Sequence, residues 1–133
     1  MNAQELSAFL VTEFPQFQCE ILGVTAEQAV VKQVINDTHL RPGGTVSGPT
    51  MMALADVALY VAILSKIGPV ALAVTTDFTC HFLNKPVANK DLVAKASLLK
   101  LGKRLVIGEV SIFSEGQPEP VAHVVATYSI PVK

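Results

Sequence analysis

The sequence has little of what several large classes of protein require. Its 133 residues include only two cysteines, Cys19 and Cys80, which are too few for a disulfide framework, so we expect a reducing, cytoplasmic environment. Ten basic and eleven acidic residues give a formal net charge of −1, which argues against a nucleic-acid or membrane-surface protein. The first residues show no basic start followed by an apolar run, so we expect no signal peptide. Half of the residues are hydrophobic, and this excludes intrinsic disorder.

Several catalytic motifs are also missing. The chain has no Gly-x-Ser-x-Gly elbow for a serine nucleophile and no Gly-x-x-x-x-Gly-Lys loop for phosphates. Its three histidines and two cysteines show no metal-ligand spacing, so we expect no metal ion. We expect no bound cofactor either. The length supports one compact domain over residues 1–133.

Hydrophobic spacing predicts the elements of the chain. Leu6, Phe9 and Leu10 stand three and four residues apart, as on an amphipathic helix, and later segments alternate with the period of two that is typical of strands. Ser47 and Pro49 are suited to the cap and first turn of a long apolar helix. The predicted order is a helix over 3–14, strands over 17–24 and 29–35, a loop over 36–45, a helix over about 47–67, and strands over 71–82, 92–101, 105–113 and 121–130.

The last four predicted strands follow one another closely. Their linkers are too short for crossover helices, so we expect them to form an antiparallel meander. In the strand over 71–82, simple alternation places Val74 and Phe78 on one face and Thr75 and Asp77 on the other.

The long helix is unusual because residues 51–64 are apolar on every side except at Asp56. This run is shorter than the roughly 18 residues that a membrane span needs. A short chain can cover such a helix only with a sheet curved around it, so the expected fold class is α+β. The mean hydropathy of +0.46 also indicates that some apolar surface is hidden between subunits.

Asp56 is the most informative single residue. An ionised carboxylate in an apolar helix needs something to solvate or pair it. The structural interpretation is a narrow hydrated stripe, or an ion pair with Arg41. We favour the functional interpretation, a general base in an apolar cleft.

The start of the long helix is the second candidate. It presents free N–H groups and the positive end of the helix dipole, and since Pro49 has no N–H, Gly48 is the natural donor to an oxyanion. Gly48 and Asp56 are eight residues apart, about two helical turns, which leaves room for one substrate carbonyl between them. A helix cap that happens to contain glycine is the simpler, structural interpretation.

These residues fall within a known family signature. Residues 44–56 (GTVSGPTMMALAD) resemble hotdog-fold acyl-CoA thioesterases of the phenylacetate-degradation (PaaI-like) type, in which Gly-x-x-His-Gly-Gly precedes Leu-Ala-Asp. Residues 74–78 (VTTDF) and 81–86 (HFLNKP) resemble the next strand of that family. The resemblance runs from about residue 36 to the C-terminus. It implies the hotdog fold, a long central helix wrapped by a curved antiparallel sheet of about five to six strands.

The resemblance implies roles for three positions. Asp56 matches the carboxylate that activates water or attacks the thioester, and Gly48 matches the glycine whose N–H polarises the thioester carbonyl. Thr75 matches a Ser/Thr that helps to position water from the neighbouring subunit of a dimer. A homodimer, and commonly a dimer of dimers, is therefore implied as well.

Three positions depart from the family pattern. The usual histidine before the glycine is Ser47, the second glycine is Pro49, and the usual Asn or Gln of the preceding loop is Arg41. Ser47 can still serve as a cap or weak donor, and Arg41 can hold Asp56 ionised or bind an anionic group of the substrate. A subfamily with altered substrates, or one without catalysis, would show such changes.

Four further residues are candidates for substrate binding. Tyr60 follows Asp56 by one helical turn, so its hydroxyl can reach the site, although a lining role is simpler. Lys85, Lys103 and Arg104 stand at predicted turns, where solvated hairpin tips are the simplest interpretation. The resemblance implies that basic turns of this kind hold the phosphates of coenzyme A.

The sequence therefore favours an acyl-CoA thioesterase that hydrolyses a small or medium acyl-CoA, with coenzyme A present only as part of the substrate. The alternative is a non-catalytic hotdog protein that binds acyl-CoA or another hydrophobic ligand. A hotdog hydratase or dehydratase fits less well, because His39 and Asp37 do not form the paired histidine and acid of that chemistry.

Overall fold

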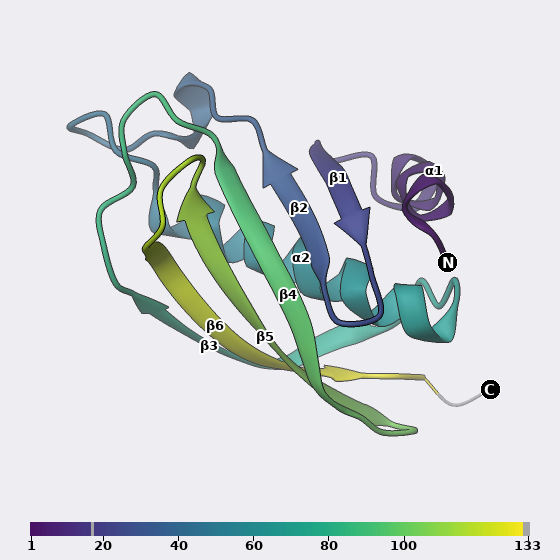
Figure 1. Cartoon of the computed structure of the whole chain (residues 1–133). Coiled ribbons are helices and arrows are strands. Elements are labelled where there is room, and N and C mark those ends of the chain that lie inside the picture. The colour runs from purple at the N-terminus through teal and green to yellow at the C-terminus, as the bar shows by residue number, and fades with distance from the viewer. Residues whose placement is uncertain (17, 132–133) are drawn as a thin grey trace.

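A six-stranded antiparallel sheet curves around one long helix (Figure 1). The computed structural model describes residues 1–16 and 18–131. Its elements in chain order are α1 (Ala3–Glu13), β1 (Cys19–Val24), β2 (Ala29–Gln33), the 3-10 helix η1 (Asp37–His39), α2 (Gly48–Ile67), β3 (Val74–Phe82), β4 (Leu92–Leu101), β5 (Leu105–Ser114) and β6 (Pro120–Ser129). Every predicted helix and strand is present, so the predicted α+β architecture is confirmed. The predicted start of the first strand, at residue 17, lies outside the described residues.

The strands lie in the order β1-β2-β4-β5-β6-β3. β4, β5 and β6 form a meander, but β3 pairs with β6 at the edge of the sheet, so the prediction of a four-strand meander is wrong. The reason is the connection over residues 83–91, which is too long for a tight hairpin and carries the chain around the end of the sheet to β4 (Figure 1). Among the described residues, β3 pairs on one side only.

α2 begins and ends at the predicted signals. Ser47 is its N-cap, and the Ser47 hydroxyl accepts a hydrogen bond from the N–H of Thr50 over 3.3 Å. Gly68 follows the last turn with a φ of +88°, in the left-handed region that favours glycine.

The C-terminal half of α2 packs into the concave face of the sheet. Every side chain from Val57 to Leu64 is buried. Gly108 of β5 permits this close packing, because a Cβ at that position would collide with the side chain of Leu59. At 20 residues, α2 is long and apolar enough to cross a membrane by length and composition. Its burial against the sheet accounts for the same composition.

The N-terminal half of α2 is covered on fewer sides. Pro49, Met52 and Ala53 are exposed, Met52 by 37%, and their spacing places them in one stripe that ends at the half-buried Asp56. The expectation that the sheet covers the helix all round therefore holds only for the C-terminal half.

A β-bulge in β3 changes which side chains face the helix. Thr75 pairs with Tyr128 of β6, yet Asp77 pairs with the adjacent Thr127, so Thr76 is an extra residue without its own partner. Thr75 therefore lies on the same face as Phe78. The alternation predicted for this strand, with Thr75 and Asp77 on one face, is wrong because it assumed an unbroken period of two.

Candidate functional site

A pocket of about 360 Å³ lies beside Asp56 of α2 and the first residues of β3. Most of its wall is apolar and is formed by Phe14, Val57, Ala71, Leu72, Ala73 and Val74. Four polar residues complete the lining, namely Asp56, Tyr60, Thr75 and Tyr128. We call this the carboxylate pocket, because Asp56 supplies the one carboxylate among its described lining residues.

Two hydroxyl groups fix the Asp56 carboxylate. Thr75 Oγ1 donates to Asp56 Oδ1 over 2.7 Å, and the Tyr128 hydroxyl approaches the same oxygen at 2.6 Å. The Tyr128 hydroxyl also lies 2.9 Å from the main-chain oxygen of Asp56. Within residues 1–16 and 18–131, no hydrogen bond reaches Asp56 Oδ2. One carboxylate oxygen is therefore held by the protein and the other is left for a ligand or water.

Two phenols stand in this pocket. Burial raises the pKa of Tyr128, and the charge of Asp56 raises it further. Burial, with a smaller contribution from the charge of Glu13, raises the pKa of Tyr60 to about 12. The Tyr60 hydroxyl donates to the carbonyl of Ala71 over 3.1 Å. Both phenols therefore remain protonated at neutral pH, but only that of Tyr128 donates to Asp56.

A second pocket lies where α2 begins and β3 ends. Its lining residues include Gly48, Arg41, Lys85 and Phe82. The Gly48 N–H is in the first turn of α2, where helix geometry supplies no intrahelical acceptor. We call this the amide pocket.

The structure separates predicted site residues into these two pockets. Asp56, Thr75 and Tyr60 line the carboxylate pocket, whereas Gly48 and Arg41 line the amide pocket. Eight residues of α-helix displace Gly48 from Asp56 by about 12 Å along the axis and about 80° around it. One chain therefore does not place both around a single carbonyl.

Within one chain, Arg41 and Thr75 are placed as follows relative to Asp56. No ion pair joins Arg41 to Asp56 in the described part of the chain, and the two residues line different pockets. Thr75, which the resemblance implied to act from the neighbouring subunit, hydrogen-bonds to Asp56 of its own chain. The bulge at Thr76 is the physical reason for that contact.

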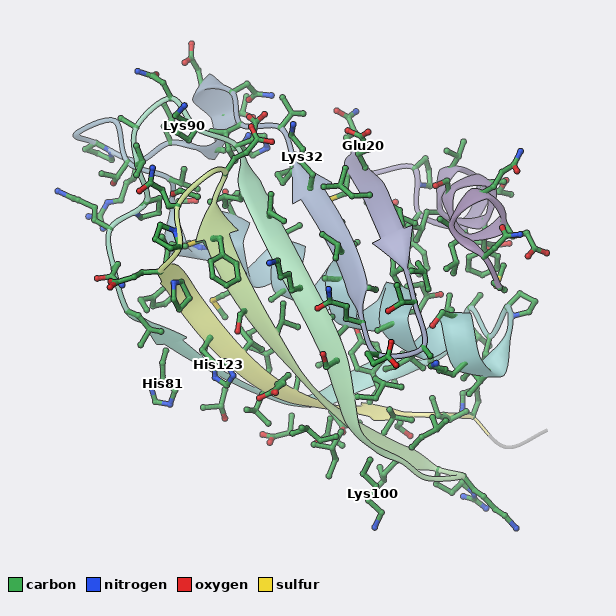
Figure 2. The ribbon with its side chains drawn as sticks, in the orientation of Figure 1. Glu20, Lys32, His81, Lys90, Lys100 and His123 are labelled. Atoms are coloured by element: carbon green, nitrogen blue, oxygen red, sulfur yellow. The ribbon has the colours of Figure 1, made fainter. Side chains whose placement is uncertain are left out.

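The remaining predicted residues lie outside the carboxylate pocket. Ser47 caps α2, and its Oγ lies 2.8 Å from Thr50 Oγ1. Lys103 and Arg104 are exposed in the turn between β4 and β5 and line neither pocket. In Figure 2 the nearby Lys100 projects from the far end of this hairpin.

Two of the histidines lie on the outer face of the sheet. His81 and His123 are cross-strand partners on β3 and β6 (Figure 2), and His123 Nε2 lies 3.2 Å from Glu109 Oε2. Across residues 1–16 and 18–131, no three His, Cys, Asp or Glu side chains are grouped to hold a metal ion.

Sequence reasoning missed Tyr128. It stands 72 residues from Asp56 in the chain, and in β6 it reads as one more inward residue of an alternating strand. Only the pairing of Tyr128 with Thr75 across β6 and β3 brings it to the carboxylate. The one available signal was its place on the buried face of that strand, where a phenol needs a hydrogen-bond partner.

The sequence model of the thioesterase superfamily matches residues 43–121, a segment that contains Gly48, Asp56 and Thr75. The chain belongs to this superfamily. Among proteins with curated functions, none matches the chain in sequence.

Solved structures of thioesterase-superfamily proteins share the fold of the chain. A Silicibacter protein with the provisional name of thioesterase is 45% identical, with a TM-score of 0.93 over 99% of this chain and 93% of that one. A variant of the phenylacetic acid degradation protein PaaI from Thermus thermophilus is 26% identical, with a TM-score of 0.75 over 88% and 96%. A hypothetical thioesterase from Streptococcus pneumoniae, solved with coenzyme A, is 17% identical, with a TM-score of 0.74 over 87% and 90%. The predicted PaaI-like hotdog fold is confirmed.

Proposed function

We propose that the protein is an acyl-CoA thioesterase in which Asp56 is the acid–base or nucleophilic group. The observation that carries the proposal is the Asp56 carboxylate, which is held through one oxygen at the wall of a mostly apolar pocket. The apolar wall suits an acyl chain, and the second oxygen is left to activate water or attack the thioester.

We infer that each active site is completed by a second copy of the chain. β3 is an edge strand with the carboxylate pocket beside its first residues and the amide pocket beside its last. Antiparallel pairing of β3 with β3 of a two-fold-related copy would bring the start of one strand to the end of the other. Val74 and Phe82 are 55% and 52% exposed, and pairing would cover them. This arrangement supplies Gly48 to the Asp56 of the partner.

The proposed chemistry needs both pockets. In the general-base route, Asp56 takes a proton from water as the water oxygen attacks the thioester carbonyl carbon. The Gly48 N–H stabilises the developing oxyanion. The C–S bond then breaks, and the proton passes to the leaving thiolate, so the products are a carboxylic acid and free coenzyme A. In the nucleophilic route an Asp56 oxygen attacks the carbonyl carbon, and the C–S bond breaks to release the coenzyme A thiolate. Water then hydrolyses the resulting anhydride to the carboxylic acid and the free carboxylate of Asp56, and the thiolate takes its proton from solvent.

Basic side chains supply candidate contacts for the coenzyme A portion. Arg41 and Lys85 are lining residues of the amide pocket, and their long side chains can extend from it to offer positive charge to phosphate groups. Lys103 and Arg104 are candidates for a more distant contact from an exposed turn. The pneumococcal neighbour that holds coenzyme A supports this class of ligand for the fold.

Asp56→Asn is the decisive test of the proposal. Release of free thiol from a panel of acyl-CoA substrates should fall by at least about a thousandfold, because the amide can neither accept a proton nor attack. Asn retains an oxygen that can accept the Thr75 and Tyr128 hydroxyls, so the thermal midpoint should change little. Asp77→Asn, an exposed carboxylate on the outer face of β3, is the matched control and should keep full activity.

Two results would contradict the proposed activity, and a third would contradict the shared site. An Asp56→Asn protein with wild-type thiol release would remove Asp56 from the reaction. Saturable acyl-CoA binding by the wild type, with no thiol release at any chain length, would instead establish the non-catalytic binding protein. A light-scattering mass equal to one chain would contradict the shared site.

A further inference from the structure

Tyr128 makes the shortest contact to Asp56, yet the sequence pattern assigns it no role. We propose that Tyr128 is a positioning residue: with Thr75 it occupies Asp56 Oδ1, so that Oδ2 alone acts on the substrate. This inference rests on the proposed thioesterase function and adds to it the identity of the reacting oxygen.

The first step of the argument is the number of donors on Oδ1. A carboxylate oxygen has two lone pairs in the plane of the group, and here two hydroxyls approach it, at 2.6 Å from Tyr128 and 2.7 Å from Thr75. Both donors come from directly paired positions of β6 and β3. Oδ1 is therefore filled by the scaffold of the sheet, and a water or thioester meets the other oxygen.

The second step is the contact of the same hydroxyl with the main chain. The Tyr128 hydroxyl lies 2.9 Å from the carbonyl oxygen of Asp56, so one phenol is held against both the side chain and the backbone of the same residue. This contact restricts rotation of the carboxylate relative to α2. Correct orientation of a catalytic group contributes directly to the rate, because it is required in the transition state.

The third step is the permanence of the donor. Tyr128 is 3% exposed, and both its burial and the charge of Asp56 raise its pKa. The phenol therefore remains protonated throughout the range in which the enzyme works. Its single proton is shared between two acceptors on Asp56, and it does not act as an acid in the reaction.

Tyr128→Phe tests the role directly, since it keeps the buried ring and removes only the hydroxyl. We expect kcat to fall by about 10- to 100-fold with KM changed by less than about threefold, because a charged hydrogen-bond acceptor loses a partner. The acidic limb of the kcat/KM profile should move to higher pH, since a hydrogen bond that favours the ionised carboxylate has been lost. A merely structural role would not move that limb.

Tyr60→Phe is the matched comparison. It also removes one phenolic hydroxyl from the carboxylate pocket, but that hydroxyl is bonded to the Ala71 carbonyl and not to Asp56. Its effect should appear in KM, and the acidic limb should stay in place. Equal shifts of the limb in both variants would overturn the specific role of Tyr128.

A third variant keeps the test decisive if Tyr128→Phe fails to fold. Replacing Tyr128 with 3-fluorotyrosine preserves the shape of the residue and makes the hydroxyl a stronger donor. The acidic limb should then move to lower pH, and an unchanged profile would overturn the inference.

Failure of this inference is distinguishable from failure of the proposed function. If wild type is active and Asp56→Asn is inactive, but Tyr128→Phe retains the wild-type kcat and pH profile, the positioning role alone is rejected. If Asp56→Asn is as active as wild type, the proposed function is rejected, and the positioning role falls with it.

Discussion

The carboxylate pocket and the amide pocket differ in the kind of chemistry that their side chains offer. The first combines a hydrogen-bonded carboxylate and two phenols with an apolar wall. The second combines the Gly48 N–H, at the N-terminus of α2, with two basic residues. One can accept a proton and hold an acyl chain, and the other can stabilise negative charge. The comparison teaches that a single chain separates the two requirements of thioester hydrolysis along β3.

Complementation between two inactive variants should give the largest effect. Asp56→Asn inactivates the carboxylate pocket, and Gly48→Pro removes the amide donor at a first helical position where proline is tolerated. If each site combines pockets from two copies, a purified mixed dimer contains one site with both defects and one intact site. We expect about half of the wild-type rate per mixed dimer, measured by thiol release, although each parent is inactive.

Differently tagged copies, purified sequentially, provide the mixed dimer for this experiment. Circular dichroism of each parent controls for folding, since a proline ring at Gly48 approaches Phe82. A mixed dimer as inactive as its parents would show that the two pockets do not cooperate between chains.

Alkaline titration should give the next largest effect, and this effect should come from the carboxylate pocket. Both tyrosines of the chain line the carboxylate pocket. The pKa of Tyr60 is raised to about 12, so this phenol ionises about a hundredfold less readily than an unfolded phenol. The pKa of Tyr128 is raised as well. Because the folded state holds these protons more tightly, their stabilisation is complete below about pH 10 and is lost as pH rises toward 12.

Phenolate absorbance at pH about 10.5 should therefore be small in the folded protein and large in denaturant. The thermal midpoint should fall steadily above pH 10, and less steeply in Tyr60→Phe. A folded protein in which one of the two phenols titrates near pH 10 would disagree with this account of the carboxylate pocket.

Removing charge from the amide pocket should give the smallest of these effects. In Arg41→Ala/Lys85→Ala we expect KM for acyl-CoA to rise about tenfold with kcat nearly unchanged, because the cations contact a part of the substrate that does not react. The KM difference between wild type and variant should shrink at high salt. Lys66→Ala, at the last turn of α2, controls for loss of charge elsewhere. An unchanged KM in the double variant would exclude these cations from substrate binding.

The elements of the fold were accessible from the sequence because their signals are local. The helical spacing of apolar residues predicts α2, with Ser47 marking its start and Gly68 its end. Alternation of apolar and polar residues predicts the strands. The order of strands was not accessible, since a nine-residue connection such as 83–91 can cross the end of a sheet as readily as it can turn back.

The candidate site was partly predictable for a similar reason. Asp56 is conspicuous because a carboxylate is out of place in an apolar helix, and Gly48 because it begins that helix. Tyr128 has no local oddity, and its role depends on a contact across 72 residues. The spacing of two helical turns predicts that Gly48 and Asp56 lie close to one substrate carbonyl. The rotation around the helix axis over those eight residues instead directs them into different pockets.

The extra residue in β3 makes the orientation of Thr75 depend on strand length as much as on residue identity. Deletion of Thr76 would restore a regular strand and leave the threonine turned toward α2, whereas a second insertion that leaves the bulge in place would turn it to the opposite face. Homologues that differ by one residue at this point can therefore keep every polar side chain of the motif and still differ in whether the carboxylate has its partner.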